Sequence, residues 1–215
     1  MTFLIGTHDG PFHADDVLAA ALIRVFYQSD AKVLRTRDLE HLSEADLVFD
    51  VGGVFDPESR RFDHHQREYQ GSRSSAGMVL DWLELEGHTK AAIARVLRAE
   101  IVDYVDAVDV GSRSSEEGVP CFSTMVGLLV ERADSGDFDH WFGRAVEMAV
   151  DIVEGVRIGH GRSSSAAAVV REAMKTAVSE GRRVLFFDEY LKWKPAYFEE
   201  GGAEHPTDYV LFPGK

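Results

Sequence analysis

The stretch FLIGTHDGPFHADDVLAAALIRVF, residues 3–26, places an apolar strand, a polar loop and a helical pattern in direct succession. Phe3 to Ile5 are apolar and end at Gly6, which predicts a short strand. The apolar residues of the helical part recur at spacings of three and four: Val17, Leu18, Ala21, Leu22, Val25 and Phe26. Strand, loop and helix in this order are typical of the first unit of an α/β domain.

The same alternation continues beyond residue 30. The sequence predicts strands at 31–36 and 47–49, a short helix or turn at 38–44, a hairpin with a proline turn at 54–62, and helices at about 75–86 and 89–109. Such alternation indicates a parallel sheet with covering helices. We therefore predict an α/β fold in which residues 1–110 form a parallel-sheet domain with helices on both faces.

The second half of the chain has a different character. Residues 111–118, GSRSSEEG, form a polar stretch suited to a domain boundary. Beyond it the sequence predicts helices at 122–132, 138–156 and about 165–179, and strands at 183–187 and 209–212. We predict a smaller, mainly helical α+β domain over residues 119–215 on the substrate side. Because no partner is evident for the last strand, we expect this domain to be incomplete.

The glycine-flanked residues Gly159-His160-Gly161-Arg162 lie between two of these helical patterns. Glycine commonly interrupts helices, so a turn between helices is the expected structure. Contact with the end of a substrate is the alternative for this segment.

Composition limits the functional classes. The 215 residues include 23 basic and 37 acidic side chains, a net charge of −14, which argues against a protein that coats nucleic acid through a broad basic surface. A metal enzyme acting on a phosphate ester is still compatible, because clustered acids can bind metal ions. There is no apolar run of membrane-spanning length and no signal peptide, and Cys121 has no cysteine partner. We expect a cytoplasmic protein without a membrane partner.

Histidines and aspartates gather near the predicted strand ends. His8 closes the first strand, Asp50 closes the third, and His13, Asp15 and Asp16 begin the first helix. Ligands in open α/β sheets collect outside the carboxyl ends of the strands, so we expect these side chains to meet. Imidazole together with carboxylate suits Mn²⁺, Fe²⁺, Co²⁺ or Zn²⁺. The alternative for the two helix aspartates is capping of the first turn.

Two further clusters carry the same residue types. Asp63-His64-His65 lies between predicted elements, and Asp103, Asp106 and Asp109 recur every three residues on one helix face. A pair of surface histidines and a solvated acidic face are the alternatives that do not involve a metal ion.

In this order, the clusters resemble the melanocyte-proliferating-gene-1 type exonuclease family. The resemblance covers about half the chain and is carried by THDG and FHADD within residues 7–16, RTRD at 35–38, DVGGVFD at 50–56, RFDHHQR at 61–67, SSAG at 74–77 and VDAVD at 105–109, and more weakly by residues 190–194 and 209–213. That family, catalogued as predicted metal-dependent hydrolases, belongs with the DHH phosphoesterases, which are named for the triplet seen here at 63–65.

The resemblance implies a DHH-type N-terminal domain with a two-metal site, usually manganese-dependent. The metal ligands that it implies are His8, His13, Asp15, Asp50, His64 and either Asp109 or Asp106. Asp50 would bridge the ions, and Asp109 is preferred because Asp109-Val110-Gly111 is similar to a step in related nucleases. His13 stands where many DHH enzymes have aspartate, and Asp16 replaces the more usual glutamate.

The catalytic residues implied are Asp50, Asp63, His64 and His65. His65 would face the scissile phosphate, and Asp63 would orient a histidine. For binding of substrate phosphate we expect Arg37, His65, Arg73 and Ser74, with Arg35 and Arg67 as further candidates. The alternatives are ordinary surface charges for the arginines and an N-cap for Ser74.

We therefore expect metal-dependent phosphodiester hydrolysis with two divalent ions, most often Mn²⁺, with Mg²⁺, Co²⁺, Fe²⁺ or Zn²⁺ as alternatives. The family resemblance implies a 3′-to-5′ exonuclease acting on RNA or short oligonucleotides, and the net charge favours a short substrate. For the assembly of the protein we consider a homodimer. The alternatives are a pyrophosphatase, a phosphodiesterase for cyclic dinucleotides or nanoRNA, a metal-dependent protein hydrolase, and a non-catalytic binding protein stabilised by metal.

Overall fold

A computed structural model describes residues 2–116, 118–134 and 136–214. Glu117, part of the predicted boundary stretch, lies outside the described residues, as do Met1 and Lys215, the ends of the two predicted domains. The structure is α/β with a mostly parallel sheet, which confirms the predicted class. It divides into two compact units, Met1–Val156 and Arg157–Lys215.

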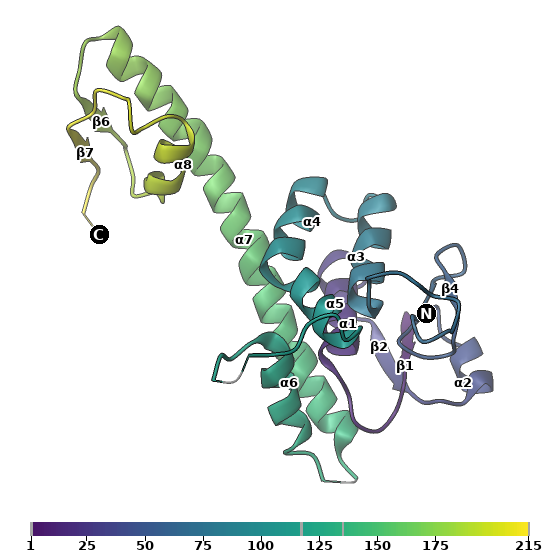
Figure 1. The fold of residues 1–215 in the computed structure, drawn as a ribbon. Coiled ribbons are helices and arrows are strands. Elements are labelled where there is room, and N and C mark those ends of the chain that lie inside the picture. The colour runs from purple at the N-terminus through teal and green to yellow at the C-terminus, as the bar shows by residue number, and fades with distance from the viewer. Residues whose placement is uncertain (1, 117, 135, 215) are drawn as a thin grey trace. The chain divides into compact units, whose positions relative to one another are not determined.

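The first unit contains a five-stranded sheet in the order β2-β1-β3-β5-β4 (Figure 1). Its strands are β1 (Leu4–Thr7), β2 (Lys32–Arg35), β3 (Leu47–Phe49), β4 (Phe55–Asp56) and β5 (Arg61–Phe62). β2, β1, β3 and β5 run parallel, whereas β4 pairs antiparallel with β5 as the predicted hairpin. The carboxyl ends of β1, β3 and β5 therefore share one edge of the sheet.

Helices cover this sheet. They are α1 (Ala14–Phe26), α2 (Leu39–Ser43), α3 (Ser75–Leu85), α4 (Ala91–Leu97), α5 (Asp103–Asp109), α6 (Phe122–Val130) and α7 (Phe138–Ser179), with a π-helical segment η1 (Arg98–Val102) joining α4 to α5. Side chains alternate along each strand, so Ile5 and Phe49 join the core on the side of α1 and α3. Leu4 and Val48 pack with Leu42 of α2 on the opposite face.

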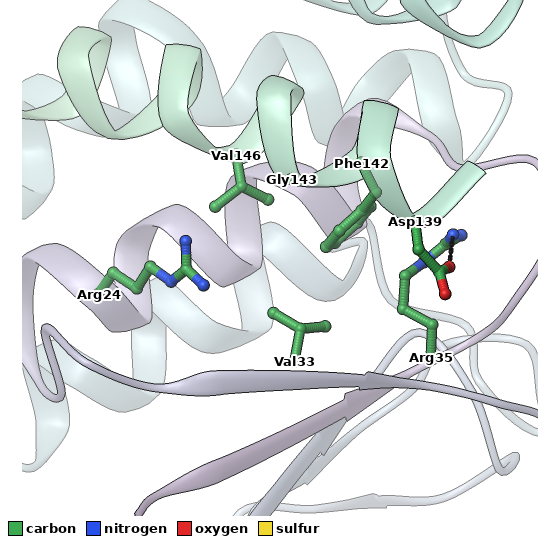
Figure 2. Close-up of a pocket in the computed structure, with 7 residues that line it drawn as sticks. All are labelled: Arg24, Val33, Arg35, Asp139, Phe142, Gly143 and Val146. Carbon is green, nitrogen blue, oxygen red and sulfur yellow. Dashed lines mark hydrogen bonds and ion pairs between the residues drawn. The ribbon is translucent and has the colours of Figure 1, made fainter. Parts of the chain in front are cut away.

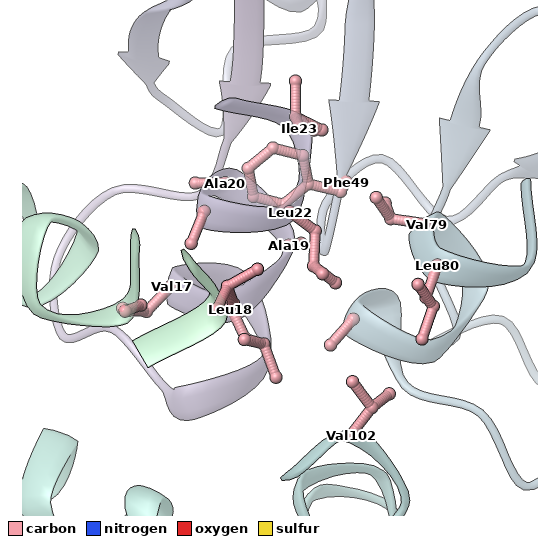
Figure 3. Close-up of a cluster of buried hydrophobic side chains, with 14 of the residues drawn as sticks. Val17, Leu18, Ala19, Ala20, Leu22, Ile23, Phe49, Val79, Leu80 and Val102 are labelled. Carbon is pink, nitrogen blue, oxygen red and sulfur yellow. The ribbon is translucent and has the colours of Figure 1, made fainter. Parts of the chain in front are cut away.

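The main core lies between the sheet, α1 and α3. Figure 3 shows Leu22 of α1 among Phe49, Val79 and Leu80, with Val102 nearby. α1 is buried continuously from Ala14 to Ile23. A helix buried on all sides must be apolar almost throughout, so its two aspartates, which lie in its first turn, require a specific reason to be there.

The predicted turn at Gly159–Arg162 is wrong. α7 continues through these residues as one helix of 42 residues, which joins the two helices expected at 138–156 and 165–179. Each glycine disfavours the helix by only about 1 kcal/mol relative to alanine, and no proline forces a break. The alanines at 166–168 favour continuation of the helix.

The second unit has a small sheet and its own core. β6 (Val184–Phe186) pairs in parallel with β7 (Tyr209–Leu211), and α8 (Trp193–Glu199) lies between them in the chain. The last strand therefore has the partner that the sequence did not reveal. The core of this unit comprises Val170, Met174, Ala177, Leu185, Phe187, Ala196 and Tyr197.

The boundary between the two units lies within α7, between residues 156 and 157. The sequence predicts a boundary at 111–118, but Phe122, Val126 and Val146 belong to the core of the first unit. The catalytic and substrate-side roles assigned to the two parts stay a prediction. Across the described residues, no helix has the length and apolar character needed to cross a membrane.

We predict that Leu22→Ala lowers the free energy of unfolding by about 2–5 kcal/mol, the usual cost of truncating a buried leucine. Leu22 is 0% exposed, so its removal leaves a cavity beside Phe49. Urea unfolding followed by circular dichroism measures the change. Leu85→Ala is the matched control: Leu85 is 79% exposed, and we expect a change below about 0.5 kcal/mol. Equal losses in the two variants would contradict the core position of Leu22.

Candidate metal centre

Three parallel strands each deliver a polar residue to the same edge of the sheet. His8 directly follows β1, Asp50 follows β3 and Asp63 follows β5. Asp50 has a φ of 57°, in the left-handed region that aspartate adopts more readily than most side chains. The chain then turns through Gly52 and Gly53, and the Gly53 N–H donates to Asp63 Oδ2 at 2.6 Å. The ends of β3 and β5 are thus tied together.

The first turn of α1 supplies the second part of the site. The N–H of His13, the N-cap residue, donates to Asp16 Oδ1 at 3.0 Å. Asp16 Oδ2 lies 3.3 Å from His8 Nε2, and Asp50 Oδ2 lies 3.2 Å from the same nitrogen. Asp16 therefore has both of the roles considered for it: one oxygen caps the helix, and the other faces the cluster.

The Asp-His-His triplet and α5 complete the arrangement. His64 Nε2 lies 2.9 Å from Asp109 Oδ2, and His64 Nδ1 lies 3.8 Å from Asp50 Oδ1. His65 is 63% exposed, and its Nδ1 lies 2.8 Å from Asp63 Oδ1. Asp63 also accepts from the His65 N–H, so it fixes the position of this histidine in two ways.

The donor atoms of these described side chains form four overlapping groups, and within each group the atoms lie within 4.8 Å of one another. The groups are Asp50 with Asp63, His64 and His65; His8 with His13 and Asp50; His13 with Asp15 and Asp109; and Asp15 with Asp16 and Asp50. Asp50 belongs to three of these groups. Apart from Asp106, every ligand implied by the resemblance lies in this cluster. Asp16 joins them, although the resemblance did not include it in the ligand set.

The carboxylates of this cluster fit a divalent cation. Both oxygens of Asp15, both oxygens of Asp50 and Oδ2 of Asp16 are buried and accept no hydrogen bond from the described residues. A buried carboxylate without a donor is strongly destabilising, and a bound cation removes that cost. Oxygen and imidazole donors together suit manganese, iron, cobalt or zinc. The residues present therefore fit a metal site, and the identity of the metal stays a prediction.

Burial and the closeness of the carboxylates also shift the pKa values of the cluster. Burial and the charges of Asp50 and Asp109 raise the pKa of Asp15 well above its usual range, and burial and Asp50 raise the pKa of Asp16 to about 7. Burial lowers the pKa of His8, but the contact of its Nε2 with Asp50 Oδ2 and the charge of Asp16 outweigh it, so the net shift is upward. Without a cation, the centre retains protons at neutral pH.

His64 and Asp109 form an ion pair within the cluster. Burial opposes charge on both groups, yet the contact with Asp109 raises the pKa of His64, and the contact with His64 lowers the pKa of Asp109. The contact therefore favours the charged forms of both groups, whereas a His64 that ligates an ion through Nε2 must be unprotonated at that nitrogen.

Asp106, the other candidate for the fourth motif, lies elsewhere. Its Oδ1 accepts from the hydroxyl of Ser74 at 2.7 Å and from the N–H of Gly77 at 3.0 Å, and its Oδ2 lies 3.1 Å from Arg73 Nη1. These contacts fasten α5 to the start of α3. Asp109, not Asp106, is the carboxylate of α5 that the structure brings to the cluster.

The same contacts account for two residues expected to bind phosphate. Ser74 is fully buried, and its hydroxyl is occupied by Asp106. Arg73 pairs with Asp103 at 2.6 Å and with Asp81 at 3.3 Å, in addition to Asp106. Both groups are thus engaged within the protein, although the Arg73 side chain is 29% exposed, and their contact with phosphate stays a prediction.

The remaining arginines differ from one another. Arg37 is 64% exposed, and its Nε lies 3.3 Å from Asp9 Oδ1, beside the loop that carries His8 and His13. Arg67 is exposed. Of the expected phosphate ligands, Arg37 and His65 thus stay accessible next to the cluster.

Arg35 has a structural role that the sequence did not reveal. Its side chain is 3% exposed, and its Nη2 donates to the Gly10 carbonyl at 2.7 Å, within the loop between His8 and His13. Figure 2 shows Arg35 paired with Asp139 of α7, beside Phe142. Arg35 therefore connects α7 to the loop that carries the ligands. The only sequence signal was its place at the end of a strand.

The family described as "Uncharacterised protein family (UPF0160)" matches residues 4–215. The chain belongs to this family. The family identified from the sequence motifs is thereby confirmed, whereas its placement among the DHH phosphoesterases stays a prediction. No solved structure matches the chain.

Curated relatives include "MYG1 protein" of Chlamydia muridarum, 38% identical over 210 residues, which are 97% of this chain and 71% of the relative. "MYG1 exonuclease" of Rattus norvegicus is 36% identical over 245 residues, covering 97% of this chain and 64% of the relative. "MYG1 exonuclease" of Bos taurus is 37% identical over 178 residues, covering 67% of this chain and 46% of the relative.

We predict that Asp15→Asn raises the Tm of the chelator-treated protein and abolishes the rise in Tm that Mn²⁺ causes in the wild type. The substitution replaces a buried carboxyl, whose ionised form is strongly disfavoured there, by a neutral amide whose N–H groups can donate to neighbouring carboxylates. A gain of about 2–5 °C is expected, because 1 kcal/mol corresponds to about 2–4 °C in a protein of this size. Asp30→Asn, at an exposed site, is the control. An undiminished Mn²⁺ effect in Asp15→Asn would exclude Asp15 as a ligand.

A second prediction concerns pH. In the metal-free protein the Asp16 carboxyl, with a pKa of about 7, is mostly protonated at pH 6 and mostly ionised at pH 8. A cation must displace this proton, so Mn²⁺ should bind about tenfold more weakly at pH 6 than at pH 8. Titration calorimetry in two buffers of different ionisation enthalpy measures both the affinity and the protons released. Constant affinity without proton release would contradict this assignment.

Proposed function

We propose that this member of the UPF0160 family is a metal-dependent phosphodiester hydrolase of the DHH type, acting as a 3′-to-5′ exonuclease on RNA or short oligonucleotides. One observation carries the proposal: Asp50 belongs to three overlapping groups of donor atoms, so its carboxylate can serve two adjacent cations. The mammalian relatives named "MYG1 exonuclease" support a nuclease activity.

The residues divide between two positions around Asp50. His8, His13, Asp15 and Asp16 share groups with Asp50, and His64 belongs to another group with Asp50; Asp109 contacts His64 and also lies with His13 and Asp15. We assign these side chains to two divalent ions, with Mn²⁺ as the first choice. Such a pair of ions supplies an activated water and offsets the charge on the phosphate.

His65 and Arg37 handle the substrate in this proposal. Asp63 accepts from Nδ1 of His65, which leaves Nε2 facing the substrate, where it can donate to an oxygen of the scissile phosphate when the imidazole carries both protons. Arg37 is exposed beside the ligand loop and can pair with a neighbouring phosphate. Both groups would contact the phosphate, while Asp15, Asp16 and Asp50 stay buried and His13 is exposed beside them. The first unit thus takes the catalytic role, and we assign the substrate-side role to the second unit.

The test uses a 5′-labelled RNA oligomer and chelator-stripped protein, with and without Mn²⁺. The wild type should produce a ladder that shortens from the 3′ end only when Mn²⁺ is present. Asp50→Asn should lower the rate by at least about a hundredfold, because the shared ligand loses its charge while asparagine still tolerates the left-handed backbone. His64→Ala should have a comparable effect.

His140→Ala is the control, since His140 is exposed on α7 and should leave the rate unchanged. Retained activity in Asp50→Asn would exclude it as the shared ligand. If the wild type leaves RNA intact, parallel assays with pyrophosphate, a cyclic dinucleotide and a peptide identify which of the other hydrolytic activities the centre has. Inactivity on all of these substrates would overturn the proposal of catalysis.

A further inference from the structure

A cleft opens directly beside the candidate metal centre. It has a volume of about 410 Å³, and one wall is formed by His13, His65 and Asp109. These three side chains belong to the donor cluster, so the cleft is continuous with the proposed catalytic site. A molecule with a phosphate at the cluster would extend into this space.

A second part of the lining comes from α6. Val126, which is 1% exposed, and Gly127 face the cleft from this helix, and Phe12, also 1% exposed, contributes from the ligand loop. A Cβ added at Gly127 would meet no atom within 4 Å, so this glycine leaves room that a larger side chain would fill. Half-buried Val108 and exposed Gly127 give the cleft accessible apolar surface, which suits the flat face of a base.

Ser123, also on α6, provides a polar group in this apolar setting. Its Oγ is buried and has no hydrogen-bond partner among the described residues. A buried hydroxyl without a partner is destabilising, whereas a ligand with a hydroxyl or a ring nitrogen would satisfy it. A nucleoside carries both kinds of group.

The charge of the cleft limits what can enter. None of the described residues that line it is an arginine or a lysine, while Asp109 adds negative charge at the edge. A second phosphate inside the cleft would lack a cationic partner. The cleft therefore suits an uncharged group attached to a single phosphate.

We propose that this cleft binds the terminal nucleoside of a nucleic-acid strand, with its phosphate at the metal centre. This inference rests on the proposed function and names the part of the substrate that the first unit recognises. The base packs against Val108 and Gly127, above the buried side chains of Phe12 and Val126, and Ser123 hydrogen-bonds to the nucleoside. Gly127 keeps the cleft wide enough for it.

The test compares the binding of adenosine 5′-monophosphate and inorganic phosphate to the Mn²⁺-loaded protein by titration calorimetry. The wild type should bind the nucleotide at least about tenfold more tightly than phosphate, since only the nucleotide fills the cleft. Gly127→Leu should lower nucleotide affinity by about tenfold and change phosphate affinity by less than about twofold. Ser123→Ala should weaken nucleotide binding about threefold to tenfold.

Gly155→Leu is the matched control, because Gly155 is an exposed helical glycine of α7 whose Cβ would also meet open space. Both leucine variants should keep the wild-type Tm or exceed it, since leucine favours helix over glycine. Wild-type nucleotide affinity in a folded Gly127→Leu variant would overturn the proposal. Equal affinity of the wild type for nucleotide and phosphate would overturn it as well.

The two proposals fail in different ways. If no phosphodiester is hydrolysed but the nucleotide still binds more tightly than phosphate and depends on Gly127, the cleft assignment stands and catalysis does not. If RNA is hydrolysed but Gly127→Leu has no effect on nucleotide binding, catalysis stands and the cleft assignment does not.

Discussion

The rest of the site depends on the repulsion between buried carboxylates around Asp50. Asp15, Asp16 and Asp50 lie within 4.8 Å of one another with almost no exposure to water. The strand ends and the fully buried helix α1 hold them there, because displacing α1 would expose the largest core of the chain. Folding therefore enforces a concentration of negative charge that only protons or cations can neutralise.

Much of this arrangement is predictable from local patterns. The alternation of strand and helix over the first hundred residues identifies a parallel sheet, and a parallel sheet brings His8, Asp50 and Asp63 to one edge without any knowledge of side-chain packing. The donor cluster thus follows from secondary structure and topology. The order of the motifs additionally identifies the family, because several motifs in a fixed order are far more specific than any single one.

Local sequence patterns do not predict the features that depend on tertiary packing. Asp106 and Asp109 lie one helical turn apart and have the same chemistry, and only the packing of α5 against α3 shows that the first fastens two helices while the second faces the cluster. The position of Arg35 depends on Asp139, more than a hundred residues away. α7 is continuous because the helix-favouring residues on either side outweigh the destabilising effect of its glycines. A pattern of a few residues does not predict which of these two effects is larger.

The π-helical segment η1 has a consequence for how this family can change through evolution. A π-turn holds one more residue than an α-turn, so every residue after it is rotated relative to an unbroken helix. Rewinding the same residues as a regular α-helix would rotate α5 by about 100°. Asp109 would then swing away from His64. The extra residue and the π-turn must therefore be kept together or lost together if Asp109 is to stay beside His64.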